Sequence, residues 1–395
     1  MEPHTVRCES DRHLAVQLLL DERVSKMRDK LREQGKMGTR RSLLAKALRL
    51  SSKVAPNLHE IKNHCVEVLA AEIEIELYVF ASPSFNAGCT PVEDERVFIL
   101  ISSSMLEAFS TDELQFVLGH ELGHHIYGHH EVPLPFILQA AKHLPAAFVL
   151  QASAWQRYAE ISADRAGMLC CGGQAPAARS LFKLSSGLRE APGAAQIKAF
   201  VEQAYDLYEE SQAAHSVERI QHHDFLSSHP FSPVRLRAAR SFDSFMKGKQ
   251  DLPAVEREVL SYMALMEPSY LDEDSPGAEA MRRLLFAAGA VVAAANGEIA
   301  KEEIEALKSL LGLARVPDTL KPELLRQHLA ERIEKVKELV VPSRRAQLIR
   351  DLALIARADG HVDDEEVAEM RSLAAELEVD PTLVETVLQA PVEVD

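Results

Sequence analysis

One five-residue stretch constrains this chain more than any other feature of its sequence: His120-Glu121-Leu122-Gly123-His124. Residues four positions apart lie on one face of an α-helix, so the rings of His120 and His124 can bind the same zinc ion. The carboxylate of Glu121 can then reach a water molecule beside that ion. A pattern with so few fixed positions also arises by chance, so its meaning depends on the sequence around it.

The surrounding sequence predicts a helix that carries this motif. Ser110 and Glu113 stand three residues apart, which is typical of a capping box at the beginning of a helix. We expect this helix to continue to about His130. A second helix is expected at residues 152–171, where two consecutive glycines end it.

The second helix carries a pair of acids, Glu160 and Asp164. Because they are four residues apart, both carboxylates lie on one helix face. One of the two can bind the same zinc ion as His120 and His124, while the other orients a ligand histidine through a hydrogen bond. The two motifs together predict a metal site formed by two helices.

Four stretches of sequence occur in a fixed order. Asn86-Ala87 comes first and is followed by STDELQFVLGHELGHHIYGHH, then EISADRAGMLCCGG, then SHPFSPVRLRAA. This order resembles the HtpX and CAAX-prenyl-protease type of gluzincin zinc metallopeptidase over about residues 60–240. Four ordered motifs are far more specific than one.

The resemblance implies a role for each residue of the two helical motifs. His120, His124 and Glu160 are implied to bind one zinc ion per chain, and Glu121 is implied to be the general base. Asp164 is implied to support a ligand histidine. The expected activity is that of an endopeptidase on protein substrates: zinc lowers the pKa of its bound water to about 7, and Glu121 accepts the proton.

The same resemblance concerns five further residues. His229 and, six positions later, Arg235 are implied to line the site and to stabilise the oxyanion or orient substrate. Asn86 and Ala87 resemble the family's edge strand, to which an extended peptide could bind by strand addition. His129 also occupies a usual family position, without a ligand role.

A second hypothesis is a catalytically silent scaffold or interaction protein, in which zinc merely holds two helices together. Glu121 discriminates between the two hypotheses, because a structural zinc site needs no base. Closed structural sites also take a fourth protein ligand in place of water. The sequence therefore favours the peptidase.

The chain is expected to have an α+β fold that is mostly helical. Residues 73–82 and 96–102 alternate in hydropathy and are rich in β-branched and aromatic side chains, which predicts a small β-sheet beside the zincin-like active-site helix. The length of 395 residues suggests more than one folded unit. We expect an N-terminal helical arm at residues 1–58, the metallopeptidase domain at 59–250, a linker at 251–280 and an all-α domain at 281–395.

The expected C-terminal domain contains an internal duplication. Residues 287–312 and 352–377 each combine an apolar helix, an Asn-Gly or Asp-Gly turn and a helix that begins with acids. This pattern resembles the tellurite-resistance TerB-like module, which implies an interaction or sensing role and a candidate surface for a protein partner. Asp363 or Asp364 is expected to cap the following helix rather than to bind calcium.

Composition limits the partners and the compartment. The formal net charge of −16 opposes a broad phosphate-binding surface, so we expect no nucleic-acid partner. Five dispersed cysteines form no C-x-x-C pair, which favours a reducing compartment, and without an export signal we expect the cytoplasm. The most apolar stretch, residues 132–154, is interrupted by prolines and charges. It predicts a buried or interfacial hairpin instead of a membrane span, and association with a membrane surface stays open.

Overall fold

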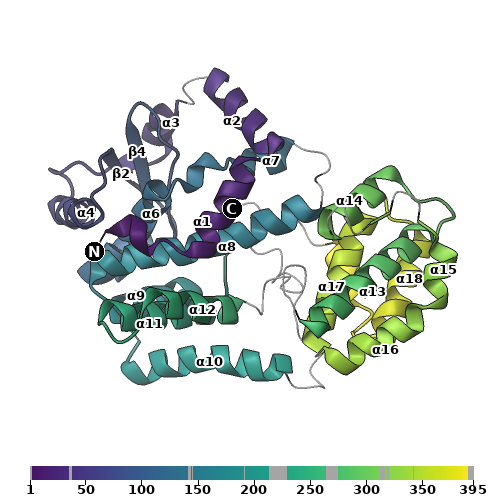
Figure 1. Ribbon diagram of the computed structural model, residues 1–395. Helices are drawn as coiled ribbons and strands as arrows, with labels where there is room; N and C mark the ends of the chain where they lie inside the picture. The colour runs from purple at the N-terminus through teal and green to yellow at the C-terminus, as the bar shows by residue number, and fades with distance from the viewer. Residues whose placement is uncertain are drawn as a thin grey trace. The chain divides into compact units, whose positions relative to one another are not determined.

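In the computed structural model the chain forms two compact units (Figure 1). The N-terminal unit consists of Met1–Ile137, Ala154–Ala204 and His229–Met263, and the C-terminal unit of Leu138–Ser153, Tyr205–Ser228 and Ala264–Asp395. The structure describes residues 2–34, 38–140, 144, 146–190, 192–212, 229–263, 275–311, 316–317, 320–340 and 342–389.

The N-terminal unit contains a four-stranded sheet in the order β1-β2-β4-β3. β2 (Glu74–Phe80) and β4 (Arg96–Ser102) pair in parallel, while β1 (Leu48–Arg49) and β3 (Ala87–Cys89) pair antiparallel at the two edges. The two longer strands match the predicted ones, and with the helices they confirm the α+β fold. β1 was expected to be helical; two residues are too few for an alternating pattern to reveal a strand.

Helices cover this sheet and form the rest of the unit. Buried residues of β2 and β4, such as Leu77 and Ile99, share one apolar core with residues of the helices, such as Leu118 and Phe242. Helix α4 (Pro56–Leu69) lies between β1 and β2 in the chain. The helices that follow β4 are α5 (Ser103–Ala108), α6 (Thr111–Ile126), η2 (His129–Glu131), α7 (Leu134–Ala140), α8 (Ala146–Cys171), α9 (Gln174–Ser186), α10 (Ala194–Gln212) and α11 (Ser232–Met246). The end of α7, the start of α8 and the end of α10 belong to the C-terminal unit.

The first residues of the chain are helical and are part of this unit. They form η1 (Pro3–Val6), α1 (Glu9–Leu19), α2 (Glu22–Gln34) and α3 (Thr39–Lys46). Cys8 belongs to a second apolar cluster with Tyr158 of α8 and Val234 of α11. This burial stabilises the start of the chain against α8 and α11.

The expected linker at 251–280 differs from the structure over its first half. Leu252–Met263 form α12, which packs on α11 and buries Val255 and Val259. The Pro- and acid-rich sequence after it suggested a linker, but the apolar residues at helical spacing within 252–263 decide the structure there. Residues 264–274, which hold most of the proposed linker sequence, lie outside the described residues.

The C-terminal unit is helical in its described part. Its core is apolar and fully buried at positions such as Leu285, Val291, Leu352 and Leu373. The helices after residue 275 are α13 (Pro276–Ala293), α14 (Lys301–Leu311), α15 (Pro322–Gln327), α16 (Leu329–Leu339), α17 (Pro342–Ala356), α18 (Asp364–Glu376) and α19 (Leu383–Gln389).

The predicted duplication corresponds to two helical hairpins, α13–α14 and α17–α18. Gly297 and Gly360 have φ angles of 99° and 88°, so each turn uses a conformation that glycine adopts without strain. Asp363 is the N-cap of α18 and forms a capping box with Glu366. The cap predicted from the sequence is therefore present.

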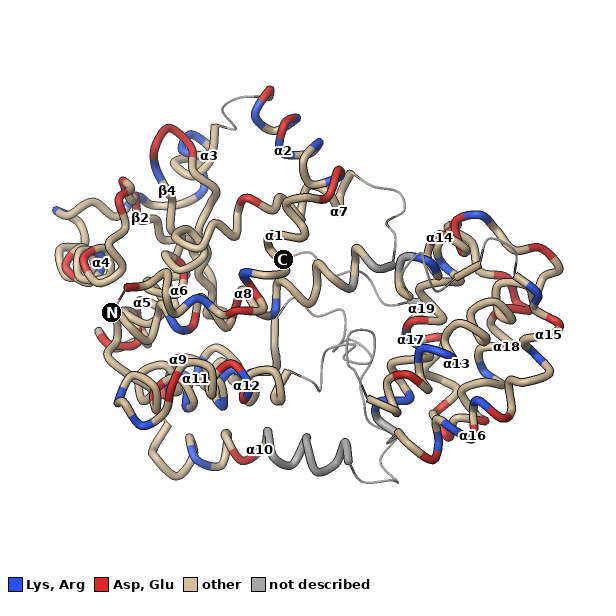
Figure 2. Tube along the Cα trace, viewed as in Figure 1, with Lys and Arg blue, Asp and Glu red and all other residues tan. Residues whose placement is uncertain are grey.

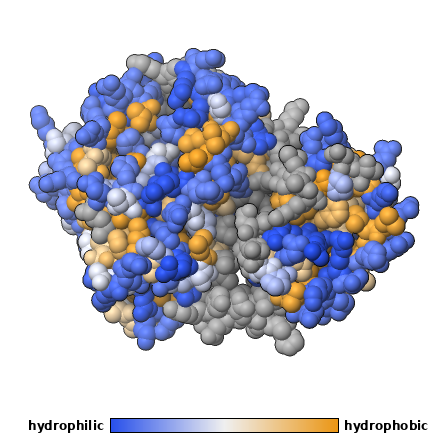
Figure 3. All heavy atoms as spheres, in the orientation of Figure 1, coloured by the Kyte–Doolittle hydropathy of each residue, from blue (hydrophilic) through white to orange (hydrophobic). Residues whose placement is uncertain are grey.

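Acidic and basic residues are interspersed along the helices of the C-terminal unit (Figure 2). On the face drawn in Figure 3, most of the coloured surface is hydrophilic, and apolar residues gather in separate groups. Among the helices in the described ranges, none is long and apolar enough to span a bilayer.

Candidate metal centre

Helix α6 presents the two motif histidines on one face. It begins with the predicted capping box, in which the backbone N–H of Ser110 donates to Oε2 of Glu113 at 2.9 Å. It ends before Gly128, whose φ of 70° stops the helix. One turn apart, His120 and His124 direct their Nε2 atoms toward each other, 3.1 Å apart.

Helix α8 brings the two acids of the second motif to these histidines. Oε1 of Glu160 lies 3.2 Å from Nε2 of His124, and its Oε2 lies 3.5 Å from Nε2 of His120. Asp164 instead lies behind the first ring, with Oδ1 3.0 Å from Nδ1 of His120. The geometry thus separates the two carboxylates: Glu160 faces the Nε2 atoms and Asp164 faces away from them.

These atoms form a compact donor set. One ligand atom each from His120, His124 and Glu160 lies within 4.8 Å of the others. Oε2 of Glu160 is buried and has no hydrogen-bond partner among the described residues. Two imidazole nitrogens and a carboxylate are ligands that zinc takes in proteins, so these residues fit the ion that the motif predicts.

The two residues of the His-Pro segment lie at the start of α11 and just before it. His229, just before this helix, places Nε2 3.5 Å from Oε1 of Glu160, and its side chain is 48% exposed. Arg235, in the first turn of the helix, donates two hydrogen bonds to Asp164, from Nε at 2.8 Å and from Nη2 at 2.7 Å. Its Nη2 also lies 3.3 Å from Oε2 of Glu160. Arg235 is therefore buried against both acids, whereas His229 stays accessible.

Charge pairing holds both acids in their ionised form. Burial would raise the pKa of Glu160, but the neighbouring His229, His120 and Arg235 lower it well below its usual range. Burial would likewise raise the pKa of Asp164, and the adjacent Arg235 guanidinium lowers it. Both carboxylates are therefore negative at neutral pH, as metal binding and histidine support require.

Glu121 is buried next to His120 on α6. Burial would lower the pKa of Arg235, but the negative charge of Asp164 raises it. The charge of Glu121 adds a smaller effect in the same direction. The carboxylate of Glu121 therefore acts on the same site as the acids of α8.

Cys89 of the edge strand lies beside the motif helix, with Sγ 3.0 Å from the carbonyl oxygen of Glu121. Burial, followed by the Glu121 charge, raises the pKa of this thiol, so it is protonated at neutral pH.

Glycines on α6 and α8 permit the close approach of the two motif helices. A Cβ atom on Gly123 would lie 2.9 Å from Cβ of Ala166 and 3.0 Å from Cα of Ala163. A Cβ atom on Gly167 would lie 2.6 Å from the carbonyl oxygen of Phe116. The motif showed Gly123 as a variable position, so its role in helix packing was not predicted.

The predicted edge strand lies beside the motif helix. Ala87 begins β3, an outer strand of the sheet that also contacts α6. Asn86 precedes it; its carbonyl oxygen accepts a hydrogen bond from the backbone N–H of Ser102 at 2.8 Å, and its own N–H donates to Oγ of Ser102 at 3.1 Å. One side of β3 therefore pairs with β4, and its other side is an edge of the sheet.

Sequence reasoning also missed a contribution from the first helix of the chain. The ring of His124 contacts His129 through their Nδ1 atoms, 2.9 Å apart, and Nε2 of His129 lies 3.1 Å from Oδ2 of Asp11 in α1. Nothing in the pattern around Asp11 links it to residues more than a hundred positions later.

Two family models match the chain. Residues 52–141 and 135–243 match peptidase family M48, and residues 282–388 match tellurite resistance protein TerB. The first match contains every residue predicted for the site, and the second contains both repeats of the C-terminal unit. Asp11 lies outside both matches.

Two curated proteins are similar to parts of the chain. The chain is 29% identical over 221 residues to the chloroplastic plastoglobule-localized metallopeptidase 48 of Arabidopsis thaliana, covering 53% of this chain and 63% of that protein. It is 30% identical over 87 residues to a protease HtpX homolog of Helicobacter pylori (strain Shi470), covering 22% and 28%. The chain thus spans less than two thirds of either relative. Residues 52–243 are thus similar to peptidase family M48, and residues 282–388 are similar to the TerB family.

Proposed function

We propose that this chain is a zinc-dependent endopeptidase, with His120, His124 and Glu160 as metal ligands and Glu121 as general base. The convergence of two ring nitrogens and one ionised carboxylate beside a buried glutamate carries the proposal. The names of the two relatives, a metallopeptidase and a protease, support the same activity.

The reaction divides between the ion and the side chains. Zinc bound here would acidify a water molecule and polarise the peptide carbonyl. Glu121 accepts the proton of the attacking water and delivers it to the leaving amine. Asp164 holds His120 through Nδ1, which leaves Nε2 of that ring free to bind the metal.

The two residues of the His-Pro segment take different roles in this proposal. His229 is half exposed and lies close to Glu160, and we assign its ring to the oxyanion as a hydrogen-bond donor. Arg235 is a positioning residue, because its guanidinium is already bonded to Asp164 and buried. The sequence suggested that both residues stabilise the oxyanion or orient substrate; in this proposal only His229 contacts the oxyanion.

An extended peptide would bind along β3. Unpaired backbone groups at a sheet edge can add a further strand, and β3 lies next to α6, which carries Glu121. Asn86 and Ala87 would thus align the peptide backbone with the site. We propose protein or peptide substrates on this ground.

The remaining assignments concern the partners and the compartment. The TerB domain is proposed to recruit a protein partner or to regulate access to the site. Five free cysteines are consistent with a reducing compartment, and we propose the cytoplasm.

Replacement of the base tests the peptidase against the zinc-stabilised scaffold. Glu121→Gln should bind one zinc ion per chain, as the parent does, and lose cleavage of unfolded casein. Glu107→Gln, the same chemical change at a surface ion pair with Arg189, is the matched control and should cleave as the parent does. Equal cleavage by Glu121→Gln and the parent would show that Glu121 is not the general base. Zinc binding without any cleavage by the parent would favour the scaffold.

A further inference from the structure

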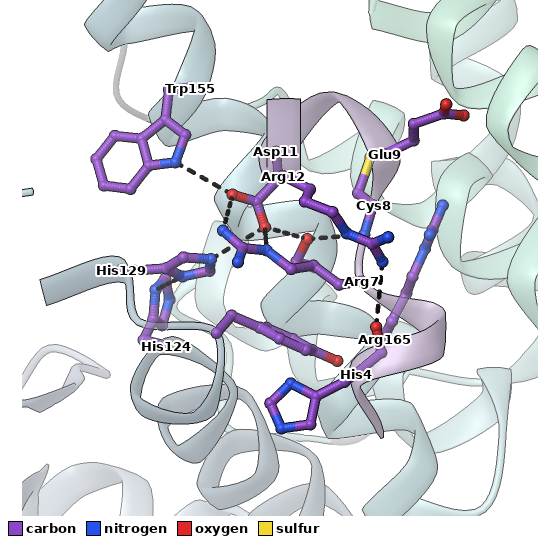
Figure 4. Close-up of polar contacts among 12 residues, drawn as sticks. His4, Arg7, Cys8, Glu9, Asp11, Arg12, His124, His129, Trp155 and Arg165 are labelled. Carbon is purple, nitrogen blue, oxygen red and sulfur yellow. Dashed lines mark hydrogen bonds and ion pairs between the residues drawn. The ribbon is translucent and has the colours of Figure 1, made fainter. Parts of the chain in front are cut away.

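The first helix of the chain places a carboxylate behind the metal centre. Asp11 of α1 is fully buried, although it lies about forty residues before the part of the chain that matches peptidase family M48. Figure 4 shows it between Arg7, Trp155 and His129, with His129 in turn directed at His124. Asp11 is therefore a buried acid that bonds to side chains from other parts of the N-terminal unit.

Five hydrogen bonds hold this carboxylate. Oδ1 of Asp11 accepts from Nη2 of Arg7 at 2.9 Å and from Nε1 of Trp155 at 3.1 Å. Oδ2 accepts from Nε of Arg7 at 2.7 Å and from Oγ of Ser162 at 2.7 Å. The fifth partner is Nε2 of His129, 3.1 Å from Oδ2. A carboxylate with this many donors is ionised and acts only as an acceptor.

The positions of the ring protons follow from this acceptor. Because Asp11 can only accept, Nε2 of His129 carries a proton, and in the neutral form of this ring Nδ1 has a lone pair. That Nδ1 lies 2.9 Å from Nδ1 of His124, so His124 must be the donor of this bond. The proton of His124 is then on Nδ1, and its Nε2 lone pair faces Glu160.

We propose that Asp11 is a positioning residue for the metal ligand His124, acting through the ring of His129. This inference rests on the proposed zinc site. The ligand His120 has a carboxylate, Asp164, directly on its Nδ1, whereas His124 reaches its carboxylate through one intervening ring. The start of the chain is thus part of the metal centre.

A purely structural role for Asp11 is the competing explanation, because it also ties α1 to Ser162 and Trp155. Glu256 of α12 provides a matched control for that role. It is a buried acid that contacts the same part of the chain, with Oε2 3.3 Å from the backbone nitrogen of Glu9 and 3.4 Å from Sγ of Cys8. Its hydrogen-bond partners among the described residues are Cys8, Glu9 and Arg165, and none of these belongs to the series of contacts that leads to His124.

The test compares zinc affinity in full-length Asp11→Asn and Glu256→Gln, measured by competition with a chromophoric chelator. Asp11→Asn should weaken zinc binding about tenfold, the lower end of the effect of removing a partner of a ligand. Glu256→Gln should leave zinc affinity unchanged, even where it lowers the melting temperature. Equal zinc affinity in Asp11→Asn and the parent, or an equal loss in both variants, would overturn the proposal.

A measurement on the parent protein keeps the proposal testable should Asp11→Asn not fold. Nitrogen-15 NMR of labelled histidines in the zinc-loaded protein reports which ring nitrogen carries the proton, and His129→Asn identifies the signals of residue 129. We expect the Nε2–H tautomer for His129 and the Nδ1–H tautomer for His124. An Nδ1–H tautomer at His129 would contradict the proposed direction of the hydrogen bonds.

The outcomes separate this inference from the proposed function. Cleavage that depends on Glu121, together with zinc affinity that does not depend on Asp11, would retain the peptidase and reject the positioning role. If zinc affinity depends on Asp11 but the parent protein cleaves no substrate, the positioning role is retained and the peptidase is rejected.

Discussion

Nδ1 of His120 lies 3.0 Å from Oδ1 of Asp164, and this contact joins the two sequence motifs from behind the metal centre. The same carboxylate is fixed by two hydrogen bonds from Arg235. Helix α8 therefore contributes both a carboxylate that faces the Nε2 atoms of the two histidines, Glu160, and one that orients a histidine ring, Asp164. The arrangement leads to predictions for residues that do not touch the metal.

Asp164→Asn should weaken zinc binding by about 10- to 100-fold, because a ligand histidine loses its charged partner. Competition with a chelator measures the dissociation constant. Asp243→Asn is the control. Asp243 is also buried and pairs with Lys247, but it accepts a hydrogen bond from the backbone N–H of Gln174 at the start of α9 and contacts no proposed zinc ligand among the described residues. Unchanged affinity in Asp164→Asn would show that His120 needs no such support.

His229→Ala should lower kcat about 100-fold, with zinc content unchanged, because it removes an oxyanion donor and leaves the ligands in place. Steady-state cleavage of fluorescent casein and metal analysis of the dialysed protein measure the two quantities. Loss of zinc from this variant would instead make His229 a ligand, and an unchanged kcat would remove it from the reaction.

Gly123→Ala should reduce both stability and zinc affinity. The new Cβ would lie 2.9–3.0 Å from Ala166 and Ala163, so α6 and α8 must move apart, at a cost of about 1–3 kcal/mol. Thermal unfolding and chelator competition check the two effects. Gly289→Ala in α13 also meets a neighbour at 2.9 Å, but outside the N-terminal unit. There the neighbour is the end of the flexible Leu307 side chain, so Gly289→Ala should leave zinc affinity unchanged. Equal zinc affinity in Gly123→Ala and the parent would contradict this account of the helix approach.

Glu113→Gln should destabilise the protein at pH 7 by about 3 kcal/mol, because it breaks a buried ion pair with Lys183 at 2.7 Å. Burial would raise the pKa of Glu113, but the hydrogen bond from Lys183 and the Ser110 backbone lower it. The stabilisation is therefore complete above the usual glutamate pKa of about 4.3 and is lost as the pH falls through the lower folded pKa. Unfolding measured from pH 7 downward should show the difference between variant and parent shrinking in acid. A difference that does not depend on pH would exclude the charge as its cause.

The sequence predicted the elements that local patterns determine. A capping box locates α6, spacing of four places His120 with His124 and Glu160 with Asp164, and Asn-Gly and Asp-Gly turns locate the hairpins of the C-terminal unit. These signals lie within a few residues of each other, so one helix turn or one loop suffices to interpret them.

The rest depends on contacts between distant parts of the chain. Asp11 reaches His124 across more than a hundred residues and only through His129, so no local pattern marks it. The motif allows any residue at position 123, so the sequence did not show that a side chain there would collide with α8 where the two helices cross. Arg235 was expected at the substrate, and only the structure reveals the two acids that engage it.

The central claim is that His120, His124 and Glu160 hold one zinc ion beside Glu121. Diffraction from crystals of the zinc-loaded protein, recorded on both sides of the zinc absorption edge, tests it most directly. We predict a single anomalous peak per chain, bonded to Nε2 of both histidines and to the Glu160 carboxylate, with one coordination position left to water. A peak elsewhere, a Glu160 turned away from the ion, or a protein side chain in that last position would contradict the account.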